Sequence, residues 1–530
     1  MSCAAVSCPT EANTYDGPVS TARRVILAVA GGVVLFLAFP DVGWWVGAPL
    51  AIAMLYVALR EATTRVGFGV GWLFGMAFFL PHLWWAYVAV SWIPWVALSA
   101  AEATAIGLVG ALTARMTRLR TLGRFLWLEP AAFAMLWVGA EQLRSAQPFG
   151  GFPWGRLAFG VVDSPLARLA WLGGAPLVSL AVALLGAILG VGLYALRERR
   201  IVQGLAAPVA VITLTALPMG LPLDGRAQTG DLKVAWAQGN LADEGLDSFA
   251  KAREVTTNHR DATLALAEKY PDAAVDLIIW PESASDIDPR SDAPSAAALT
   301  EAARAFNAPL LFGTNDYSPD DGRYNTSLVW LPSGEALPGV EYRKQQIVAF
   351  GEYIPMRSFA RIFSEEVDRV STEVIPGEGP ARLDVPIASL DRDVIVGPII
   401  CFEVAYDWVP LQSVREGAEF LAVQTNNATF GATAESTQQL AMSRLRALET
   451  GRATLQVSTV GVSAVISPTG RVLDRAELFT RDADIATIPL RTSLTPATRW
   501  GGPLAVVLEF LAAVTVLGAL FTGSAKRNGR

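Results

Sequence analysis

The strongest constraint on the fold is a series of long apolar runs that fills most of the first 221 of the 530 residues. Most of these runs are close to the ~20 residues that a membrane-spanning helix needs. Residues 184–196 are apolar all round, as expected for a helix surrounded by lipid. We therefore predict a multi-pass α-helical membrane domain of eight transmembrane helices. The predicted spans lie at about residues 25–39, 43–59, 66–90, 92–113, 125–143, 176–196, 201–221 and 503–522.

The composition agrees with a membrane protein and excludes several other classes. Charged residues make up 17% of the chain, below the about 25% that is typical of soluble proteins. The net charge is −7 and no long basic tract is present, so no nucleic-acid partner is expected. The cysteines, Cys3, Cys8 and Cys401, are spaced neither as a disulfide framework nor as zinc ligands. Since the chain shows no metal or nucleotide motif, we expect no cofactor.

Basic residues gather in alternate loops between the predicted spans. With the N-terminus inside, the inner loops and tails hold 14 arginines and lysines, and the short outer loops hold three. The positive-inside rule then places both termini in the cytoplasm. Seven spans carry the next segment to the other side of the membrane. The predicted organisation is a cytoplasmic tail at 1–22, a seven-helix transmembrane domain at 23–224, an extracytoplasmic domain at 225–500, and an eighth helix with a cytoplasmic tail at 501–530.

The extracytoplasmic segment alternates between short apolar runs and helical patterns. The runs suit strands that are buried on both faces, and the alternation favours a layered α/β domain. Helices are predicted at 247–269 and 433–450, with Gly451 in a C-cap position. In such domains chemistry sits at the carboxyl ends of strands. The predicted strands lie at 232–238, 276–280, 309–314, 326–331, 394–400 and 419–424.

Three reactive side chains follow these segments. Glu282 comes just after the run at 276–280, Cys401 follows the run at 394–400, and Lys344 lies between them in the sequence. A thiol must lose its proton to act as a nucleophile. A neighbouring glutamate could take that proton, and a lysine could stabilise the oxyanion that forms on the attacked carbonyl. The chain has only two histidines, and this chemistry needs none.

Several short motifs, in this order and in this membrane context, resemble the nitrilase superfamily. More closely, the chain resembles its membrane-embedded family, the apolipoprotein N-acyltransferases, over nearly its whole length. The matching stretches are Gly151-Phe152-Pro153-Trp154, Gln238-Gly239-Asn240, Trp280-Pro281-Glu282-Ser283, Tyr342-Arg343-Lys344, Phe350-Gly351-Glu352-Tyr353-Ile354-Pro355, Cys401-Phe402-Glu403, Thr425-Asn426-Asn427 and Arg444-Leu445-Arg446-Ala447-Leu448-Glu449.

The resemblance implies a nitrilase-like αββα sandwich for residues 225–500 and a role for each of five residues. It makes Glu282 the general base, Lys344 the oxyanion-stabilising residue and Cys401 the nucleophile, with Glu352 and Glu403 supporting the site. Two positions depart from the family pattern: Phe402 stands where a tyrosine is usual, and Thr429 stands where a tryptophan is usual.

The resemblance also implies an activity and a location. The enzyme would transfer a fatty acyl chain from a membrane phospholipid, through a Cys401 thioester, to the N-terminal amine of the S-diacylglyceryl-cysteine of apolipoproteins. The products would be mature triacylated lipoproteins and a lysophospholipid. The expected place is the bacterial cytoplasmic (inner) membrane, with the catalytic domain on the periplasmic side. We expect a monomer.

Each feature also has a simpler interpretation. Cys401 could be a small buried hydrophobe, Glu282 could cap a helix, Lys344 could be a solvated charge, and Glu352 and Glu403 could be structural hydrogen-bond partners. Two other functions stay open at this stage. One is a membrane-tethered nitrilase-type amidase that acts on a small substrate, and the other is a non-enzymatic transporter or scaffold.

Three further features of the membrane domain allow more than one interpretation. His82 follows Pro81 in an apolar run, which favours a helix-packing role. The loop 151–155 is either an element of a lipid portal or an ordinary turn. The tryptophans predicted to mark the membrane interfaces are Trp44, Trp45, Trp84, Trp85, Trp92 and Trp95.

Overall fold

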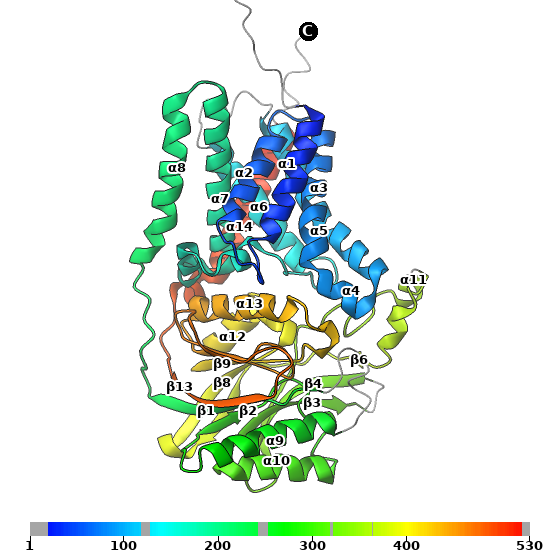
Figure 1. Ribbon diagram of the computed structural model, residues 1–530, viewed down its shortest axis with the longest axis vertical. Helices are drawn as coiled ribbons and strands as arrows, with labels where there is room; N and C mark the ends of the chain where they lie inside the picture. The colour runs from blue at the N-terminus through cyan, green and yellow to red at the C-terminus, as the bar shows by residue number, and fades with distance from the viewer. Residues whose placement is uncertain (1–19, 118–127, 242–252, 319–321, 363, 522–530) are drawn as a thin grey trace, which may run out of the picture.

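The computed structural model describes residues 20–117, 128–241, 253–318, 322–362 and 364–521. It has two parts, a helical bundle and an α/β sandwich that lies against one end of the bundle (Figure 1). The helices of the bundle are α1 (Thr21–Phe36), α2 (Gly47–Leu59), α3 (Thr64–His82), α4 (Trp84–Val90), α5 (Trp92–Thr117), α6 (Leu128–Ala146), α7 (Ala170–Arg197), α8 (Ile201–Ala216) and α14 (Pro496–Phe521).

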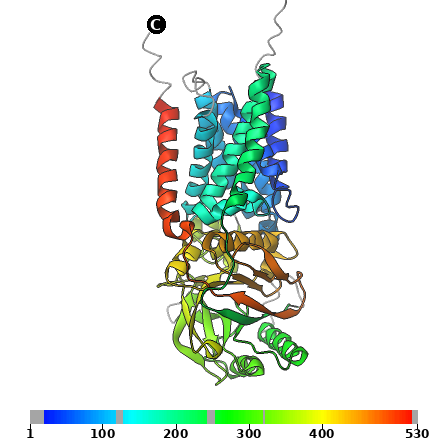
Figure 2. The ribbon, with the colours of Figure 1, turned by 90° about the vertical axis from the view of Figure 1, so that its left-hand side faces the viewer.

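Within the described residues, five helical segments are long and apolar enough to cross a membrane. α1 and α2 coincide with predicted spans but have 16 and 13 residues, and α6 carries Glu129, Glu141 and Arg144. α14 runs along the outside of the bundle (red in Figure 2). The five segments are Thr64–His82, Trp92–Thr117, Pro165–Arg197, Ile201–Gly220 and Pro496–Phe521.

The predicted single span at 66–90 is wrong, because two helices occupy it. α3 ends at His82, Leu83 has non-helical dihedral angles, and α4 begins at Trp84. Pro81 lies in the last turn of α3, where its ring removes a backbone donor and disfavours the helical conformation of the preceding residue. The apolar composition continues through the break, so hydropathy alone could not reveal it.

The α/β part consists of two stacked sheets. One has the strand order β13-β1-β2-β3-β4-β5, with β6 paired to β4, and the other has the order β12-β11-β10-β9-β8-β7. The strands at the centre of each sheet, β1-β2-β3 and β8-β9-β10, are parallel. The strands are β1 (Asp231–Gln238), β2 (Leu277–Ile279), β3 (Leu310–Tyr317), β4 (Gly322–Trp330), β5 (Ala336–Arg343), β6 (Glu373–Val374), β7 (Leu383–Ile387), β8 (Arg392–Ile400), β9 (Phe420–Thr425), β10 (Thr454–Ser458), β11 (Ala464–Ile466), β12 (Val472–Arg475) and β13 (Asp482–Pro489).

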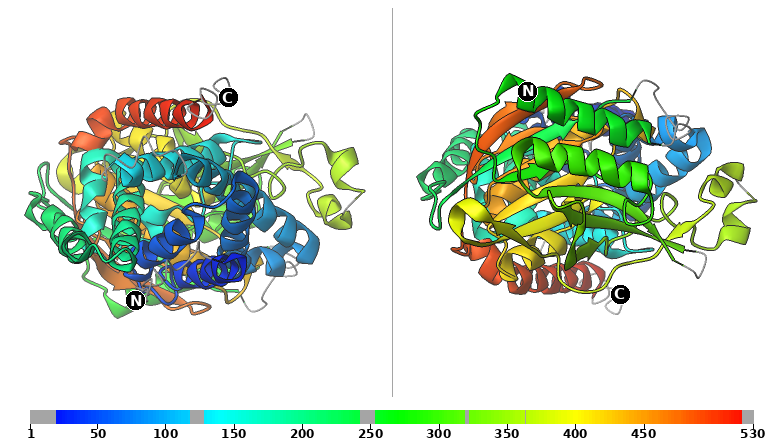
Figure 3. Two further views of the ribbon diagram at one scale, coloured as in Figure 1. Left: turned by 90° about the horizontal axis from the view of Figure 1, so that it is seen from above. Right: turned by 90° about the horizontal axis from the view of Figure 1, so that it is seen from below.

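Helices cover the outer face of each sheet. α9 (Glu254–Lys269) and α10 (Ala293–Phe306) cover the first sheet at the end farthest from the bundle, as the view from below shows (Figure 3). α12 (Trp408–Arg415) and α13 (Glu435–Thr450) lie between the second sheet and the bundle (Figure 1). The layered α/β architecture expected from the sequence is therefore confirmed.

Polar side chains join the two sheets at their centre. The Gln424 side chain of β9 donates to the carbonyl of Trp280 at 2.7 Å and accepts from Ser327 of β4 at 2.6 Å. Around these bonds, one apolar core extends from the bundle into the space between the sheets. The carboxyl ends of β2, β5 and β8 therefore have fixed positions relative to one another and to the membrane part.

Most predicted strands coincide with observed ones, whereas some helices differ. Of the predicted helix 247–269, residues 254–269 form α9, and residues 242–252 lie outside the described part of the chain. Gly451 caps α13 in the left-handed conformation, with φ of 65°, as predicted. α10 and α12 were not predicted. α10 begins after the N-cap Asp292 and has a proline in its first turn, which was the available signal for this helix.

Candidate functional site

The three strand-end residues predicted from the sequence lie together between the two sheets. Glu282 follows β2, Lys344 follows β5, and Cys401 is the first residue of a short 3-10 helix, η8 (Cys401–Ala405), that follows β8. All three are buried. Glu282 and Cys401 interact electrostatically with each other, and Lys344 interacts with both. A base, a cation and a nucleophile therefore occupy one enclosed cluster.

The backbone at Cys401 is in a sparsely populated conformation. Its φ is 52°, a left-handed value that is unfavourable for a residue with a Cβ, and Ser283 beside Glu282 has φ of 50°. Arg446 of α13 holds the turn by donating to the carbonyls of Val404 and Ala405, each at 2.8 Å. The surrounding structure thus keeps the thiol at the end of the strand, where it turns out of the sheet.

The Cys401 thiol is neutral at rest. Burial raises its pKa, the carboxylate of Glu282 raises it further, and Lys344 opposes the increase only in part. Two polar groups approach the sulfur: Thr425 Oγ1 at 3.6 Å and Gln439 Nε2 at 3.9 Å. Because the thiol keeps its proton, it needs a base before it can attack.

Glu282 is well placed to be that base. Its Oε1 accepts from Asn325 Nδ2 at 2.6 Å and its Oε2 accepts from the backbone amide of Asn426 at 2.8 Å. These bonds fix the carboxyl group between the two sheets. Burial raises the pKa of Glu282 above its usual value, although Lys344 opposes this. A carboxylate with a raised pKa is a stronger proton acceptor than one in water.

Lys344 remains an ammonium ion in this site. Burial disfavours its charge, but the carboxylates of Glu352 and Glu282 outweigh burial and raise the pKa of Lys344 above its usual value. Its Nζ is 2.7 Å from Glu352 Oε1, and Glu352 Oε2 accepts from the backbone amide of Val348 at 2.8 Å. Glu352 therefore orients Lys344, which leaves the other ammonium protons for a developing oxyanion.

Glu403, the second predicted supporting residue, accepts hydrogen bonds from backbone amides and does not form an ion pair with Lys344. Its Oε1 accepts from the Tyr342 hydroxyl and from the Gln345 amide, each at 2.8 Å, and its Oε2 accepts from the Ile400 amide at 2.8 Å. It thereby ties the turn that carries Cys401 to the segment that carries Lys344. The two supporting glutamates thus occupy different places.

The sequence reasoning missed a buried acid beside the site, Glu435 at the start of α13. Asn427 Nδ2 donates to its Oε2 at 2.6 Å, and burial raises the pKa of Glu435 to about 8. Glu435, Gln439 and Arg446 recur at helical spacing on a helix whose side chains are almost all buried. This row of polar residues on a buried helix is the sequence signal that could have revealed Glu435. Asn325 lies in the middle of β4, in a stretch without any motif, and gave no signal.

Aromatic rings form a wall on the bundle side of the site. Phe402 stacks on Trp154 with ring centroids 4.5 Å apart, and Trp85 packs edge-on against Phe430 at 5.1 Å and Phe402 at 6.1 Å. Phe402, which departs from the family pattern, thus contributes an apolar face where a tyrosine would place a hydroxyl. Trp85 is buried in this wall, so the prediction that it marks a membrane interface is wrong.

The loop 151–155 is an ordered element that the bundle holds in place. Arg144 donates to the carbonyls of Phe152 at 3.0 Å and Trp154 at 2.7 Å, and it pairs with Glu102 at 2.8 Å. A second polar chain links the loop to the sandwich, since Trp154 donates to the Gln438 side chain at 2.6 Å. Gln438 in turn bonds the carbonyl of His82, in agreement with a helix-packing role for that histidine.

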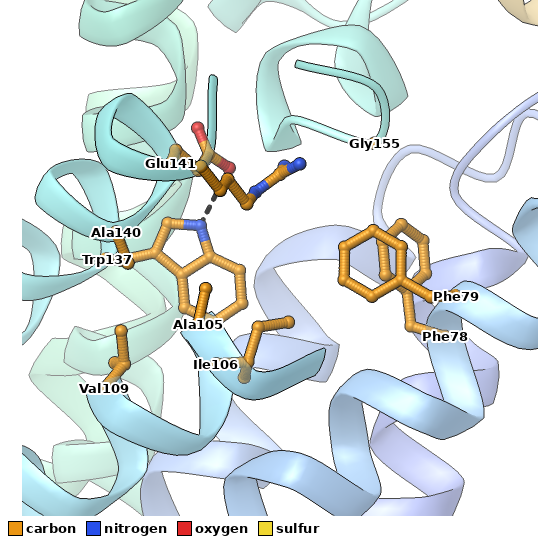
Figure 4. Close-up of a pocket in the computed structure, with 10 residues that line it drawn as sticks. Phe78, Phe79, Ala105, Ile106, Val109, Trp137, Ala140, Glu141 and Gly155 are labelled. Carbon is orange, nitrogen blue, oxygen red and sulfur yellow. Dashed lines mark hydrogen bonds between the residues drawn. The ribbon is translucent and has the colours of Figure 1, made fainter. Parts of the chain in front are cut away.

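A recess inside the bundle lies on the membrane side of this loop (Figure 4). Trp137 faces Phe78 and Phe79 across it, and the indole nitrogen of Trp137 donates to Glu141 at 2.9 Å. Cys401 is not among the lining residues, so the recess is separate from the thiol. Its lining consists of Phe78, Phe79, Ala105, Ile106, Val109, Trp137, Ala140, Glu141, Arg144 and Gly155.

No metal site accompanies the cluster in the part of the chain that the structure describes. Over those ranges, no group of three or more histidine, cysteine, aspartate or glutamate side chains is arranged to hold a metal ion.

Comparisons with known proteins cover both parts of the molecule. Residues 31–188 match the profile of the apolipoprotein N-acyltransferase N-terminal domain, and residues 233–494 match that of the carbon-nitrogen hydrolases. The chain is 40% identical to an apolipoprotein N-acyltransferase of Mycolicibacterium smegmatis, over 92% of this chain and 84% of the relative. It is 31% identical to the enzyme of the same name from Azotobacter vinelandii, over 90% and 91%.

Solved structures of the nitrilase superfamily are similar to part of the chain. An amidase from Nesterenkonia sp. AN1 is 16% identical, covers 51% of this chain and 95% of its own, and has a TM-score of 0.36. The Nit3 protein of Saccharomyces cerevisiae is 20% identical, covers 49% and 90%, and has a TM-score of 0.35.

Proposed function

The chain belongs to the apolipoprotein N-acyltransferase family, and from this premise we propose that Cys401 carries a fatty acyl group between two membrane substrates. The resemblance seen in the sequence motifs is confirmed, and the protein is an acyltransferase that matures lipoproteins. The proposed acyl donor is a membrane phospholipid. The proposed acceptor is the N-terminal amine of the S-diacylglyceryl-cysteine of an apolipoprotein, and the product is a triacylated lipoprotein.

In the first half-reaction, Cys401 attacks the ester carbonyl of the phospholipid. Glu282 takes the thiol proton, the sulfur bonds to the carbonyl carbon, and Lys344 donates hydrogen bonds to the oxyanion. As the ester C–O bond breaks, Glu282 returns the proton to the departing alkoxide. A lysophospholipid leaves, and a thioester remains on Cys401. The mutual electrostatic influence of Glu282 and Cys401, which are buried in the same cluster, supports this proton path.

In the second half-reaction, the free amine of the diacylated lipoprotein attacks the thioester. Glu282 takes a proton from the amine, and Lys344 again stabilises the oxyanion. The C–S bond breaks, an amide forms, and the thiolate leaves and recovers a proton from Glu282. The aromatic wall of Trp85, Trp154 and Phe402 supports this step, because an apolar surround limits attack on the thioester by water.

For the membrane part, we propose eight transmembrane helices, with the catalytic domain outside the cytoplasmic membrane and both termini inside. The apolar faces of α8 and α14 support this arrangement. Val202, Val209, Phe510 and other large apolar side chains on these helices are exposed in the isolated chain, where a bilayer would cover them. Because one chain supplies the whole thiol cluster, we propose that the enzyme acts as a monomer.

One observation carries the proposal: the Glu282 carboxyl, the Lys344 ammonium and the Cys401 thiol meet in one buried cluster beside the membrane bundle. A membrane-tethered amidase would use the same three groups, but family membership favours the acyl transfer. A transporter or scaffold would not need the thiol.

The test is the intact mass of the full-length protein purified from membranes. The wild type should carry an adduct of fatty acyl size on Cys401, and Cys401→Ala should carry none and should no longer N-acylate a diacylated lipopeptide. Cys3→Ala/Cys8→Ala is the matched control and should keep both properties. Continued N-acylation by Cys401→Ala would refute the thioester route, and a short polar adduct on the wild type would favour an amidase.

A further inference from the structure

A second recess lies where the bundle meets the sandwich, away from the thiol cluster. Segments that are far apart in the sequence line an open recess of about 200 Å³. They are the start of α7, the linker after α8, the C-cap of α13 and the turn between β13 and α14. The lining residues are Trp171, Pro222, Leu223, Asp224, Gln228, Gly451, Pro468, Arg491, Ser493, Leu494 and Thr495.

Two arginines at this recess are buried without a strong acidic partner. Arg491 lines the recess and is 5% exposed, and Arg452 behind it is fully buried. Arg452 donates to the carbonyls of Ala418 at 2.7 Å and Ser493 at 2.8 Å and, among the described residues, forms no ion pair. Across the same ranges, Arg491 Nε and Arg452 Nη2 have no hydrogen-bond partner.

The neighbouring carboxylates do not neutralise this pair. Asp224 lies 3.6 Å from Arg491, but its side chain is 42% exposed. Glu419 is engaged by Arg392 at 2.6 Å. Burial and the charge of Arg491 lower the pKa of Arg452 to about 10. Two like charges that share a buried site are unfavourable unless an anion compensates them.

We propose that this recess binds a phosphate-ester anion. An arginine side chain presents planar donors that match phosphate oxygens. Arg491 lines the recess, its Nη1 donates to the carbonyl of Arg226, and its Nε has no partner among the described residues. Ser493 accepts from Gln228 Nε2 at 2.8 Å, which leaves its hydroxyl proton available to the same anion. The ligand class is therefore a phosphate mono- or diester that fits between a guanidinium and a hydroxyl group.

The recess can be occupied while the thiol cluster works. Glu435, beside the thiol, begins α13, and Gly451, at the recess, ends it. A helix of 16 residues is about 24 Å long, so the two sites lie at opposite ends of the same helix. Trp171 and Leu223 add an apolar side from the bundle end. A phospholipid headgroup at the membrane surface or a free phosphate could supply the anion.

The experiment measures the melting temperature of the full-length protein in detergent with each of two probes. Dihexanoyl phosphatidylglycerol represents the headgroup and sodium phosphate represents the free anion, each against sodium chloride of equal ionic strength. A ligand that binds only the folded state raises the melting temperature, and we expect a rise of about 3 °C or more. A rise with the lipid alone identifies a headgroup site, and an equal rise with phosphate identifies a free-anion site.

Two variants and two controls decide whether the recess is responsible. Arg491→Gln removes the buried cation. Gln228→Glu keeps the oxygen that accepts from the amides of Thr492 and Ser493 and places a negative charge beside Arg491. Both should lose the ligand-induced rise, whereas Arg226→Gln, whose side chain is 89% exposed, should keep it.

Cys401→Ala should also keep the rise, so failure of this site and failure of the thioester mechanism can be told apart. A wild type that responds to neither probe would overturn the proposal. So would a full response in Gln228→Glu. This variant loses the Nε2 donor to Ser493 but keeps the acceptor for the amides of Thr492 and Ser493, so it is the variant that decides if Arg491→Gln does not fold.

Discussion

Two buried clusters of charge lie within the same molecule and differ in what their charges do. The thiol cluster consists of Glu282, Lys344, Glu352 and Cys401. The junction cluster, where the loop after α6 meets the sandwich, consists of Arg156, Asp407, Arg446 and Glu449. In the junction cluster, Asp407 bonds Arg156 at 2.8 Å and Arg446 at 2.9 Å, and Arg446 bonds Glu449 at 2.5 Å.

The difference lies in the balance of acids and cations. The junction has two arginines, and the buried Glu141 adds a third carboxylate, 3.7 Å from Arg156. The two arginines lower the pKa of Asp407 although its side chain is partly buried, and the facing carboxylates raise the pKa of Arg446. The charges of Asp407 and Arg446 are therefore fixed, whereas burial raises the pKa of Glu449.

The thiol cluster has one cation, and burial raises the pKa of both Glu282 and Cys401. Protons can therefore move between the groups of the thiol cluster. A site for chemistry is thus distinguished by a larger excess of protonatable groups over cations, and not by buried charge as such.

The largest expected effect concerns the proton acceptor of the thiol cluster. Glu282→Gln keeps the size of the side chain and can still bond Asn325, but it cannot take a proton. Loss of a general base typically reduces the rate 10²- to 10⁴-fold, and we expect a fall of about 10³-fold in N-acylation of a diacylated lipopeptide. The rate at which the acyl adduct forms on Cys401 after phospholipid is added, measured by intact mass, should also fall, because Glu282 takes the thiol proton in the first half-reaction.

Glu341→Gln is the matched control for that change. Glu341 lies in β5, three residues from Lys344, but its side chain is 37% exposed and pairs with surface arginines. Its activity should stay within twofold of the wild type. Full activity in Glu282→Gln would contradict the contrast between the two clusters. The charges of the thiol cluster would then only stabilise the structure, as those of the junction cluster do.

A smaller loss is expected when the single cation of the thiol cluster is removed. Lys344→Met keeps the length of the side chain but removes the donor for the oxyanion, which typically reduces the turnover rate 10²- to 10³-fold. Glu352 then loses its 2.7 Å partner, so Lys344→Met/Glu352→Gln should be no less active than Lys344→Met. The measurement is kcat for the lipopeptide. An unchanged kcat would show that Lys344 only balances charge.

Much of the thiol cluster and of the helical bundle could be predicted from the sequence, for identifiable reasons. Glu282, Lys344 and Cys401 stand at strand ends inside recognisable motifs, and topology brings strand ends of this kind to one place. Apolar runs located the helices of the bundle because lipid-facing and core-facing segments have similar composition. For the same reason the sequence did not reveal the break at Leu83, which changes backbone direction without changing polarity.

Contacts that depend on tertiary structure could not be predicted. Asn325 bonds Glu282 from the middle of a strand, and the buried Arg491 has only the half-exposed Asp224 as an acidic partner because of what surrounds it in space. Glu352 and Glu403 looked alike in the sequence, yet one pairs with Lys344 and the other accepts backbone amides. Which partner a buried acid meets depends on side-chain geometry across the two sheets, and no local pattern encodes that.

The junction cluster should respond in stability rather than in chemistry. Asp407→Asn removes one acid from two arginines, and Glu449 still faces Arg446, so the loss should be below the 3–5 kcal/mol typical of a broken buried pair. We expect about 2 kcal/mol, or ~5 °C in melting temperature. Because the folded-state pKa of Asp407 lies below its usual value, this difference should be complete near pH 7 and should shrink as the pH falls below about 4.

The matched control is Asp163→Asn, which also bridges the two parts through Arg444 but has a side chain 54% exposed. Its melting temperature should stay within about 1 °C of the wild type. If Asp407→Asn kept its melting temperature but lost turnover at saturating substrate, the junction would belong with the chemistry and the contrast between the clusters would fail.

The smallest expected effect tests whether Glu435 belongs with the protonatable acids of the thiol cluster. Glu435 lies beside the thiol cluster with its pKa raised to about 8 by burial, and Glu282 adds to the increase. A group whose pKa is raised in the folded state loses stability as the pH rises from its unfolded pKa through the folded value. Glu435→Gln, which keeps an acceptor for Asn427, should therefore melt with the wild type near pH 4.5 and about 2 °C above it at pH 9.

The same substitution should change the thiol itself. The charge of Glu435 is one of the groups that raise the pKa of Cys401, so its removal should move the pH midpoint of Cys401 alkylation down by about half a unit. Glu301→Gln on α10, whose side chain is 56% exposed, should leave the midpoint in place. If the alkylation midpoint did not shift and the difference in melting temperature did not depend on pH, Glu435 would be a structural acid like those of the junction cluster. The protonatable acids of the thiol cluster would then be Glu282 and Glu352.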